Sequence, residues 1–252
     1  AALQPGASAD HVLSGATLWT EILPRTLLQG DTRNAFAIAA PWRCTHLKLH
    51  IDPDGGVARL RVHGEVVPDP VAVAGPGDAP AGAVPQVDLA ALEHGGQVVA
   101  ASDMFFGGRH HLVLPGASRG MHDGWETRRR RGLGHDWALV KLAARGTIDR
   151  VIVDTSHFKG NAPGSCWIEV ADTPGRALEE LTATSFPWKP LLASTPLQPH
   201  DVREFTDALE SVGPVTHAIL RIHPDGGVAR LRLFGRVDPT GRRALVLARL
   251  DA

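Results

Sequence analysis

Acidic, basic and imidazole side chains are concentrated between positions 110 and 161. Two strings carry most of them: MHDGWETRRRR begins at Met121, and DTSHFKGN begins at Asp154. Carboxylates and imidazoles are the groups that proteins use to move protons near neutral pH, and guanidinium groups pair with carboxylates. Taken alone, the residues predict either a hydrolase or a binder of a small anion.

The first string places a run of arginines, 128–131, shortly after Asp123 and Glu126. Such a run is commonly a solvated surface, and this alternative stays open for each arginine. In a binding site, the guanidinium groups would capture an anion and keep both carboxylates ionised. Glu126 is then a candidate general base or hydrogen-bond acceptor.

Two further segments have both a structural and a chemical interpretation. His135 stands before Asp136-Trp137, where it is either held beside a core tryptophan or shuttles a proton. Asp154 and Asn161 either satisfy turn amides or belong to a site, in which Asn161 and Lys159 bind carbonyl or carboxylate oxygens.

Metal-ligand spacing of the metallohydrolase type is missing from the sequence, which favours a site without a metal. Five histidines in one region, at positions 110, 111, 122, 135 and 157, still leave a divalent ion as an alternative. Nucleophile elbows, phosphate-binding loops and dinucleotide fingerprints are missing as well. Cys166 lies in an apolar string, CWIEV, and is expected in the core.

One segment occurs twice in the sequence. The first copy, residues 46–64, reads HLKLHIDPDGGVARLRVHG, and the second copy, residues 217–235, reads HAILRIHPDGGVARLRLFG, 171 positions later. Upstream, the tryptophan-led strings at Trp19 and Trp188 align with an offset of 169. A repeat of about 170 residues has the size of a domain.

This offset predicts the domain organisation. Residues 87 to about 170 have no counterpart for the first copy within the sequence. We expect residues 1–74 to be the C-terminal part of a first repeat, 75–86 a linker rich in Gly, Pro and Ala, and 87–252 a complete second repeat. A partial sheet with an open edge is expected to be poorly stable by itself.

Alternating apolar residues predict two strands, paired as a hairpin across the Asp-Gly-Gly turn, in each copy. The polar face of the second hairpin gathers cations, so carboxylates or a bound anion should face it: Arg221, His223, Arg230 and Arg232. Other predicted strands are 137–142, 148–154, 166–170 and 244–250, with a short helix over 88–92. Many short strands and few helices predict an all-β protein, an antiparallel jelly-roll β-sandwich.

The composition limits the classes of partner. Lys+Arg 26 against Asp+Glu 27 gives a formal charge of −1, which disfavours nucleic acid and anionic membranes. Apolar runs stay well below the roughly 20 residues of a membrane span, and the first residues lack the layout of a signal peptide. Two cysteines cannot form a disulfide framework, so we expect a cytoplasmic protein.

Several strings together resemble the allantoicase family: ASDMFFG from Ala101, MHDGWETRRRR, GHDW from Gly134, DTSHFKGNAPGSC and both copies of PDGGVARLR. The resemblance implies tandem jelly-roll repeats of the galactose-binding-like kind in a homo-oligomeric enzyme of purine degradation. The reaction that it implies is hydrolysis of allantoate to ureidoglycolate and urea.

Allantoate carries one carboxylate and two ureido groups on a single carbon. For this substrate, the density of polar side chains in the strings makes Arg128 and Arg129 the first candidates to bind the carboxylate, with Lys159, Asp154 and His157 as further substrate-binding candidates. Asn161 would donate to the ureido carbonyl groups.

For catalysis, cleavage of the central C–N bond requires a proton for the departing urea and a base that activates water. His135 or His122 is the candidate acid and Glu126 the candidate base. Asp123, with Glu126, is expected to accept hydrogen bonds from the ureido N–H groups.

Two other functions remain open from the sequence alone. One is a non-catalytic jelly-roll module that binds a small anion or a carbohydrate, because the fold does not decide function. The other is an inactive, truncated allantoicase.

Overall fold

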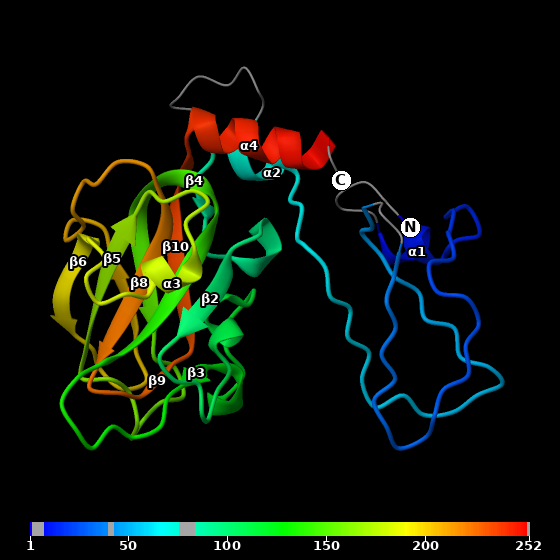
Figure 1. Cartoon of the computed structure of the whole chain (residues 1–252), viewed down its shortest axis with the longest axis horizontal. Helices are drawn as coiled ribbons and strands as arrows, with labels where there is room; N and C mark the ends of the chain where they lie inside the picture. Colours follow the sequence, from blue (N-terminus) through cyan, green and yellow to red (C-terminus); the bar gives the residue numbers. More distant parts are fainter. Residues whose placement is uncertain (2–7, 40–42, 76–83, 251–252) are drawn as a thin grey trace. The chain divides into compact units, whose positions relative to one another are not determined.

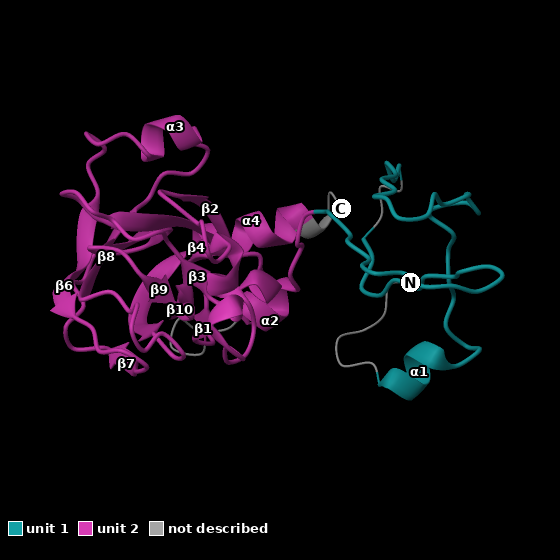
Figure 2. Cartoon of the chain, turned by 90° about the horizontal axis from the view of Figure 1, so that it is seen from below, with its two compact units in different colours: residues 1–64, 252 teal, residues 65–251 magenta. Residues whose placement is uncertain are grey.

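The structure is a computed structural model of the chain, and it describes residues 1, 8–39, 43–75 and 84–250. The chain divides after Gly64 into two compact units (Figure 2). Most of the predicted linker, residues 76–83, lies outside the described residues. The boundaries at residues 74 and 87 therefore remain a prediction.

Unit 1, residues 1–64, includes helix α1 (Ala9–Leu13), whose first turn is capped by the Ser8 hydroxyl. Its described residues form no β-strand, so the strands predicted within the first copy are wrong. The leucines that alternation would bury remain about half exposed, as at Leu49 with 51 %. A strand needs a neighbour to pair its N–H and C=O groups, and the part of unit 1 that the structure describes supplies none.

Unit 2 is an antiparallel β-sandwich, which confirms the predicted fold class (Figure 1). Its strands are β1 (Val87–Asp88), β2 (Gln97–Ala101), β3 (Trp125–Glu126), β4 (Asp136–Asp154), β5 (Ser165–Ala171), β6 (Lys189–Pro196), β7 (Val202–Phe205), β8 (Val215–His223), β9 (Gly227–Val228) and β10 (Arg230–Val237). Its helices are α2 (Pro70–Ala74), η2 (Leu92–His94), η3 (Arg109–Val113), η4 (Met121–Asp123), α3 (Leu178–Leu181) and α4 (Pro239–Leu250).

Strand β4 is long enough, at 19 residues, to take part in both layers of the sandwich. Its first part, 136–141, pairs with β2 and β8, and β8 continues the layer through β5 to β6. Its second part, 146–154, pairs with β10 and β7. The pairing register with β8 shifts between Lys141 and Gly146, and such an irregularity lets a strand bend from one layer to the next.

Alternation along these strands separates a core from an outer face. Ala138 and Val140 of β4 and Leu220 and Ile222 of β8 point into the main core. Leu139, between the two β4 residues, and Ile219, directly before Leu220, face outwards and pack against Leu181 of α3. The segment that contains α3 therefore covers part of the outer face of this layer.

The two strands of the second copy are confirmed, but their pairing as a hairpin is wrong. Strands β8 and β10 each pair with a different part of β4, so the turn between them connects the two layers. The carboxylates expected beside the cations of the second copy are present. Arg221 forms an ion pair with Glu169, Arg230 with Asp123, and Arg232 with Asp88.

Two other predicted elements differ from the structure. Residues 244–250, predicted as a strand, belong to helix α4. The missed signal is Asp238-Pro239: Pro is favoured at a helix start, and the Asp238 carboxylate accepts from the Gly241 amide at 2.8 Å. The helix predicted over 88–92 is wrong: Asp88 ends strand β1, residues 89–90 form a turn, and only the 3₁₀ turn η2 (Leu92–His94) follows.

Candidate active site

Glu126 lies where three connecting segments meet. Strand β3 pairs with β9, which places Glu126 opposite Gly227, and Gly107 bridges to Glu126 from the other side. The Gly227 amide donates to the carbonyl of Asn161 at 2.8 Å. A Cβ on Gly227 would lie 2.0 Å from the Phe158 ring, so the second glycine of the Asp-Gly-Gly turn permits this close packing.

The side chains of Glu126 and Asn161 are in contact. Asn161 Nδ2 donates to Glu126 Oε1 at 2.5 Å, and both residues are partly exposed. A hydrogen bond to a carboxylate is stronger than one between neutral groups. The contact joins the two chemical strings of the sequence, 35 positions apart, at one place.

Arg128 is anchored at the edge of this cluster by Asp103. Its amide and its Nε donate to the two carboxylate oxygens of Asp103 at 2.8 and 3.0 Å, and its guanidinium carbon lies 4.8 Å from the centre of the Phe105 ring. Burial opposes ionisation of Asp103, but the amides of Arg128 and Phe105 and the Arg128 guanidinium outweigh it and lower the pKa of this carboxyl. The Arg128 side chain stays 65 % exposed, and Arg129 and Lys159 are exposed too.

Arg130 turns inwards instead of following its neighbours into solvent. Its guanidinium forms an ion pair with the buried carboxylate of Asp136, which also accepts from the Ser102 hydroxyl at 2.9 Å. The Arg130 amide donates to Asp225 Oδ2 at 2.8 Å. Of the four arginines, Arg130 thus has a structural role, and its amide connects the segment to Asp225 in the turn after β8.

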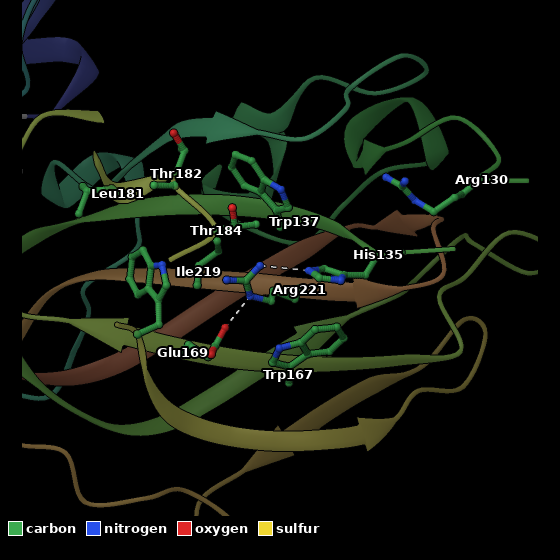
Figure 3. Close-up of a pocket in the computed structure, with 13 residues that line it drawn as sticks. Arg130, His135, Trp137, Trp167, Glu169, Leu181, Thr182, Thr184, Ile219 and Arg221 are labelled. Atoms are coloured by element: carbon green, nitrogen blue, oxygen red, sulfur yellow. Dashed lines mark hydrogen bonds and ion pairs between the residues drawn. The ribbon is translucent and has the colours of Figure 1, made fainter. Parts of the chain in front are cut away.

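His135 lines a pocket on the outer face of the sheet (Figure 3). Its Nε2 lies 3.0 Å from Nη1 of Arg221, and its ring is 4.8 Å from that of Trp167. Because a guanidinium can only donate, Nε2 must be the acceptor. Burial, followed by the charges of Arg221 and Arg130, lowers the pKa of His135. These groups favour a neutral imidazole with its proton on Nδ1.

Three other candidates hold loops in place. The Asp123 carboxylate is buried between Arg119 and Arg230, each at 3.2 Å. Asp154 accepts from the Ser156 amide at 2.7 Å, and His157 is hydrogen-bonded to Ser118 and His200. For Asp154 the turn-forming interpretation is therefore the one that the contacts support.

His122, the remaining candidate, is an exposed residue of η4. Residues that sequence reasoning missed are Asp103, Asp225 and Glu169. Asp103 belongs to the ASDMFFG string and Asp225 to the repeated Asp-Gly-Gly turn, so either residue could have been selected from these sequence motifs. Nothing in the sequence indicates that Glu169 faces Arg221.

Metal ligands do not gather within the described part of the chain: no three His, Cys, Asp or Glu side chains there could hold an ion. Burial raises the pKa of the Cys166 thiol to about 12, which fits the predicted core position. Among the described helices, none is both long and apolar enough to cross a membrane.

A sequence profile of the allantoicase repeat matches residues 1–67 and 87–238. The chain belongs to the allantoicase family. A probable allantoicase of Stutzerimonas stutzeri is 47 % identical over 91 % of this chain and 67 % of its own length. Probable allantoicase 2 of Burkholderia pseudomallei is 43 % identical over 92 % of this chain and 69 % of its own. The chain thus spans about two thirds of these allantoicase relatives.

The crystal structure of allantoicase from Saccharomyces cerevisiae is similar to this structure, with a TM-score of 0.52 and 35 % identity. The match covers 60 % of this chain and 43 % of the yeast allantoicase chain. Membership of the allantoicase family, expected from the strings, is confirmed.

Proposed function

We propose that this chain hydrolyses allantoate to ureidoglycolate and urea. Its family membership supports the reaction, and the contact between Glu126 and Asn161 is the observation that carries the assignment of the site. That contact combines a carboxylate, able to accept a proton, with an amide, able to bind a carbonyl or an N–H group.

In this proposal Glu126 is the base. One of its oxygens is held by Asn161, so the carboxylate has a defined orientation and its other oxygen can take a proton from an attacking water. Asn161 keeps its side-chain carbonyl and its second N–H for the substrate. A single hydrogen bond thus fixes both side chains before the substrate arrives, which lowers the entropy lost on reaching the transition state.

Arg128 and Arg129 bind the substrate carboxylate in this proposal, and Lys159, two positions before Asn161, adds a third cation. Arg128 uses one side of its guanidinium for Asp103, and most of the side chain remains exposed. Because a guanidinium has five N–H donors, the remaining ones suffice for a carboxylate.

The proton for the departing urea comes from His122 rather than from His135 in this proposal. The lowered pKa of His135 keeps its imidazole neutral near pH 7, and its Nε2 is already an acceptor for Arg221. A neutral imidazole is a poor acid, so His135 orients Arg221 instead. Asp123, Asp154 and His157 act through the loops that they hold.

The proposal needs no cofactor, with positive charge supplied by guanidinium groups. We further propose that the protein is a cytoplasmic homo-oligomer, which binds a small-molecule substrate and no nucleic acid. Light scattering coupled to size-exclusion chromatography measures the oligomeric state. Dialysis against EDTA tests the absence of a metal cofactor, and we expect it to leave the turnover of allantoate unchanged.

Release of urea from allantoate is the test. Glu126→Gln is expected to lower kcat by about 100-fold or more, since general base catalysis contributes about 10²–10⁴. Glu204→Gln, which removes an exposed carboxylate paired with Arg150, is the matched control and should retain full turnover. Unchanged turnover in Glu126→Gln would remove Glu126 from the mechanism, and no urea from the unaltered chain would refute the activity.

A further inference from the structure

The pocket on the outer face of the β4–β8–β5 layer is a feature that the proposed chemistry does not use. It is a cavity of about 470 Å³, open on one side, between this layer and the segment that contains α3. Arg221 of β8 lies at its centre, with His135 on one side and Glu169 of β5 on the other (Figure 3).

Arg221 and Glu169 offer complementary hydrogen-bonding groups to this cavity. Arg221 Nε donates to Glu169 Oε2 at 2.5 Å, and Nη1 donates to His135. Within the described residues, Arg221 Nη2 and Glu169 Oε1 make no hydrogen bond. Both side chains are mostly buried, at 20 % and 25 % exposure. Donor and acceptor atoms held this firmly are available to a ligand without reorganisation.

Aromatic rings form the walls around this pair. Trp137 of β4 and Trp167 of β5 lie opposite Arg221 on the two neighbouring strands (Figure 3). Trp188 also lines the cavity. Indole faces are large, flat and apolar, so they favour planar groups that stack on them. The lining is thus suited to a thin, planar ligand group rather than a bulky one.

Charges in the pocket are balanced. Arg221 is paired with Glu169, Arg130 with Asp136, and His135 is held neutral. A ligand carboxylate bound to Arg221 would also lie close to the Glu169 carboxylate, because Glu169 is hydrogen-bonded to the same guanidinium, and the two negative charges would repel each other. A neutral group that combines a carbonyl with an N–H next to it meets both atoms favourably.

We propose that this pocket binds a ureido group, whose carbonyl accepts from Arg221 and whose N–H groups donate to Glu169, between the tryptophan rings. The choice of a ureido group over another planar amide rests on the proposed function. His135 and Glu169 are positioning residues here, because they set the orientation of the Arg221 guanidinium.

Binding of a non-reacting probe to the full chain tests this proposal. N-carbamoylglycine carries one ureido group and one carboxylate, and N-acetylglycine replaces the terminal amine by a methyl group. We expect N-carbamoylglycine to shift the indole N–H signals of Trp137, Trp167 and Trp188 in NMR spectra, saturably. N-acetylglycine should bind at least about tenfold more weakly, since one N–H donor to Glu169 is lost.

Two variants address the pocket, and one serves as control. Glu169→Gln removes the charged acceptor, and Ala183→Trp fills the cavity from an exposed position in case Glu169→Gln does not fold. Each should weaken probe binding by at least about tenfold. Arg150→Gln, which removes a half-buried guanidinium stacked 3.8 Å from Phe234, should bind the probe as the unaltered chain does.

Equal affinity for both probes, or unaltered binding in Glu169→Gln and Ala183→Trp, would overturn the assignment. Failure of the proposed function has a different signature: the unaltered chain would release no urea from allantoate, whatever the indole signals show. Glu126→Gln separates the two again, because it should lose turnover and keep binding of the probe.

Discussion

The two copies of the repeated segment have nearly the same sequence and different structures. In the second copy, residues 217–235 form β8, β9 and β10, with Leu231 fully buried. In the first copy, residues 46–64 form no strand, and Leu60, at the position equivalent to Leu231, is 58 % exposed. Both copies nevertheless make the same turn, with φ of +134° at Gly55 and +136° at Gly226.

This comparison separates local from long-range causes. The turn depends on glycines that tolerate positive φ, and they are present in both copies. The strands depend on β4, because β8 and β10 pair with β4 and not with each other. Among the residues of 1–64 that the structure describes, no strand takes the place of β4, so the same alternating pattern forms no sheet there.

Replacing the equivalent arginine in each copy should give the largest difference in the free energy of unfolding between the two copies. Arg230 is buried and bonded to Asp123, Gly116 and Ala229, whereas its equivalent, Arg59, is exposed. Arg230→Met should lower the free energy of unfolding by about 3–5 kcal/mol, because it leaves a buried carboxylate with fewer partners. Arg59→Met should stay within about 0.5 kcal/mol. Urea denaturation followed by circular dichroism measures both, and equal losses would show that the first copy folds as the second does.

Replacing the equivalent leucines by alanine should give a somewhat smaller difference in the free energy of unfolding between the two copies. Leu231→Ala creates a cavity in the core, and we expect it to lower the free energy of unfolding by about 2–5 kcal/mol. Leu60→Ala removes methyl groups that are already half in water, so a change within about 0.5 kcal/mol is expected. Thermal melts of the two variants check this, and a large loss from Leu60→Ala would contradict the exposed position of that side chain.

The smallest expected effect is a pH dependence of the free energy of unfolding that comes from Asp123, the carboxylate paired with Arg230 of the second copy. Burial raises the pKa of Asp123, but the amide and guanidinium of Arg119 and the charge of Arg230 outweigh it, so the pKa lies below 3.8. A lowered pKa stabilises the fold above the unfolded value and loses this contribution as the pH falls through the folded value. The stability difference between the unaltered chain and Asp123→Asn should therefore shrink below about pH 4. A difference that stays constant from pH 7 to pH 2 would contradict this ion-pair assignment.

The candidate site shows the same division between sequence and structure. Glu126 and Asn161 could be selected from the sequence, because each lies in a string dense in polar side chains, and the structure brings them together. Asp123 and Asp154 lie in the same strings, yet their carboxylates hold loops. Residue type and density alone do not distinguish a carboxylate that faces a ligand from one that satisfies a buried arginine.

The pocket around Arg221 could not have been found from the sequence. Arg221, Glu169 and His135 come from separate strands and a loop, and only the pairing of β5 with β8 places Glu169 beside Arg221. The alternation did predict that Arg221 faces away from the core and needs a negative partner. Which carboxylate provides it depends on the register of strands more than 50 positions apart.

The sequence by itself determined the family, the all-β class and the repeated turn, because strings, glycines and alternation are local properties of the chain. It placed Glu126 and Asn161 among a larger set of candidate site residues. Tertiary structure alone decided which copy becomes sheet and which carboxylates pair with arginines. The physical reason is that strand pairing, burial and charge neutralisation each require a second segment, and its position is a property of the fold.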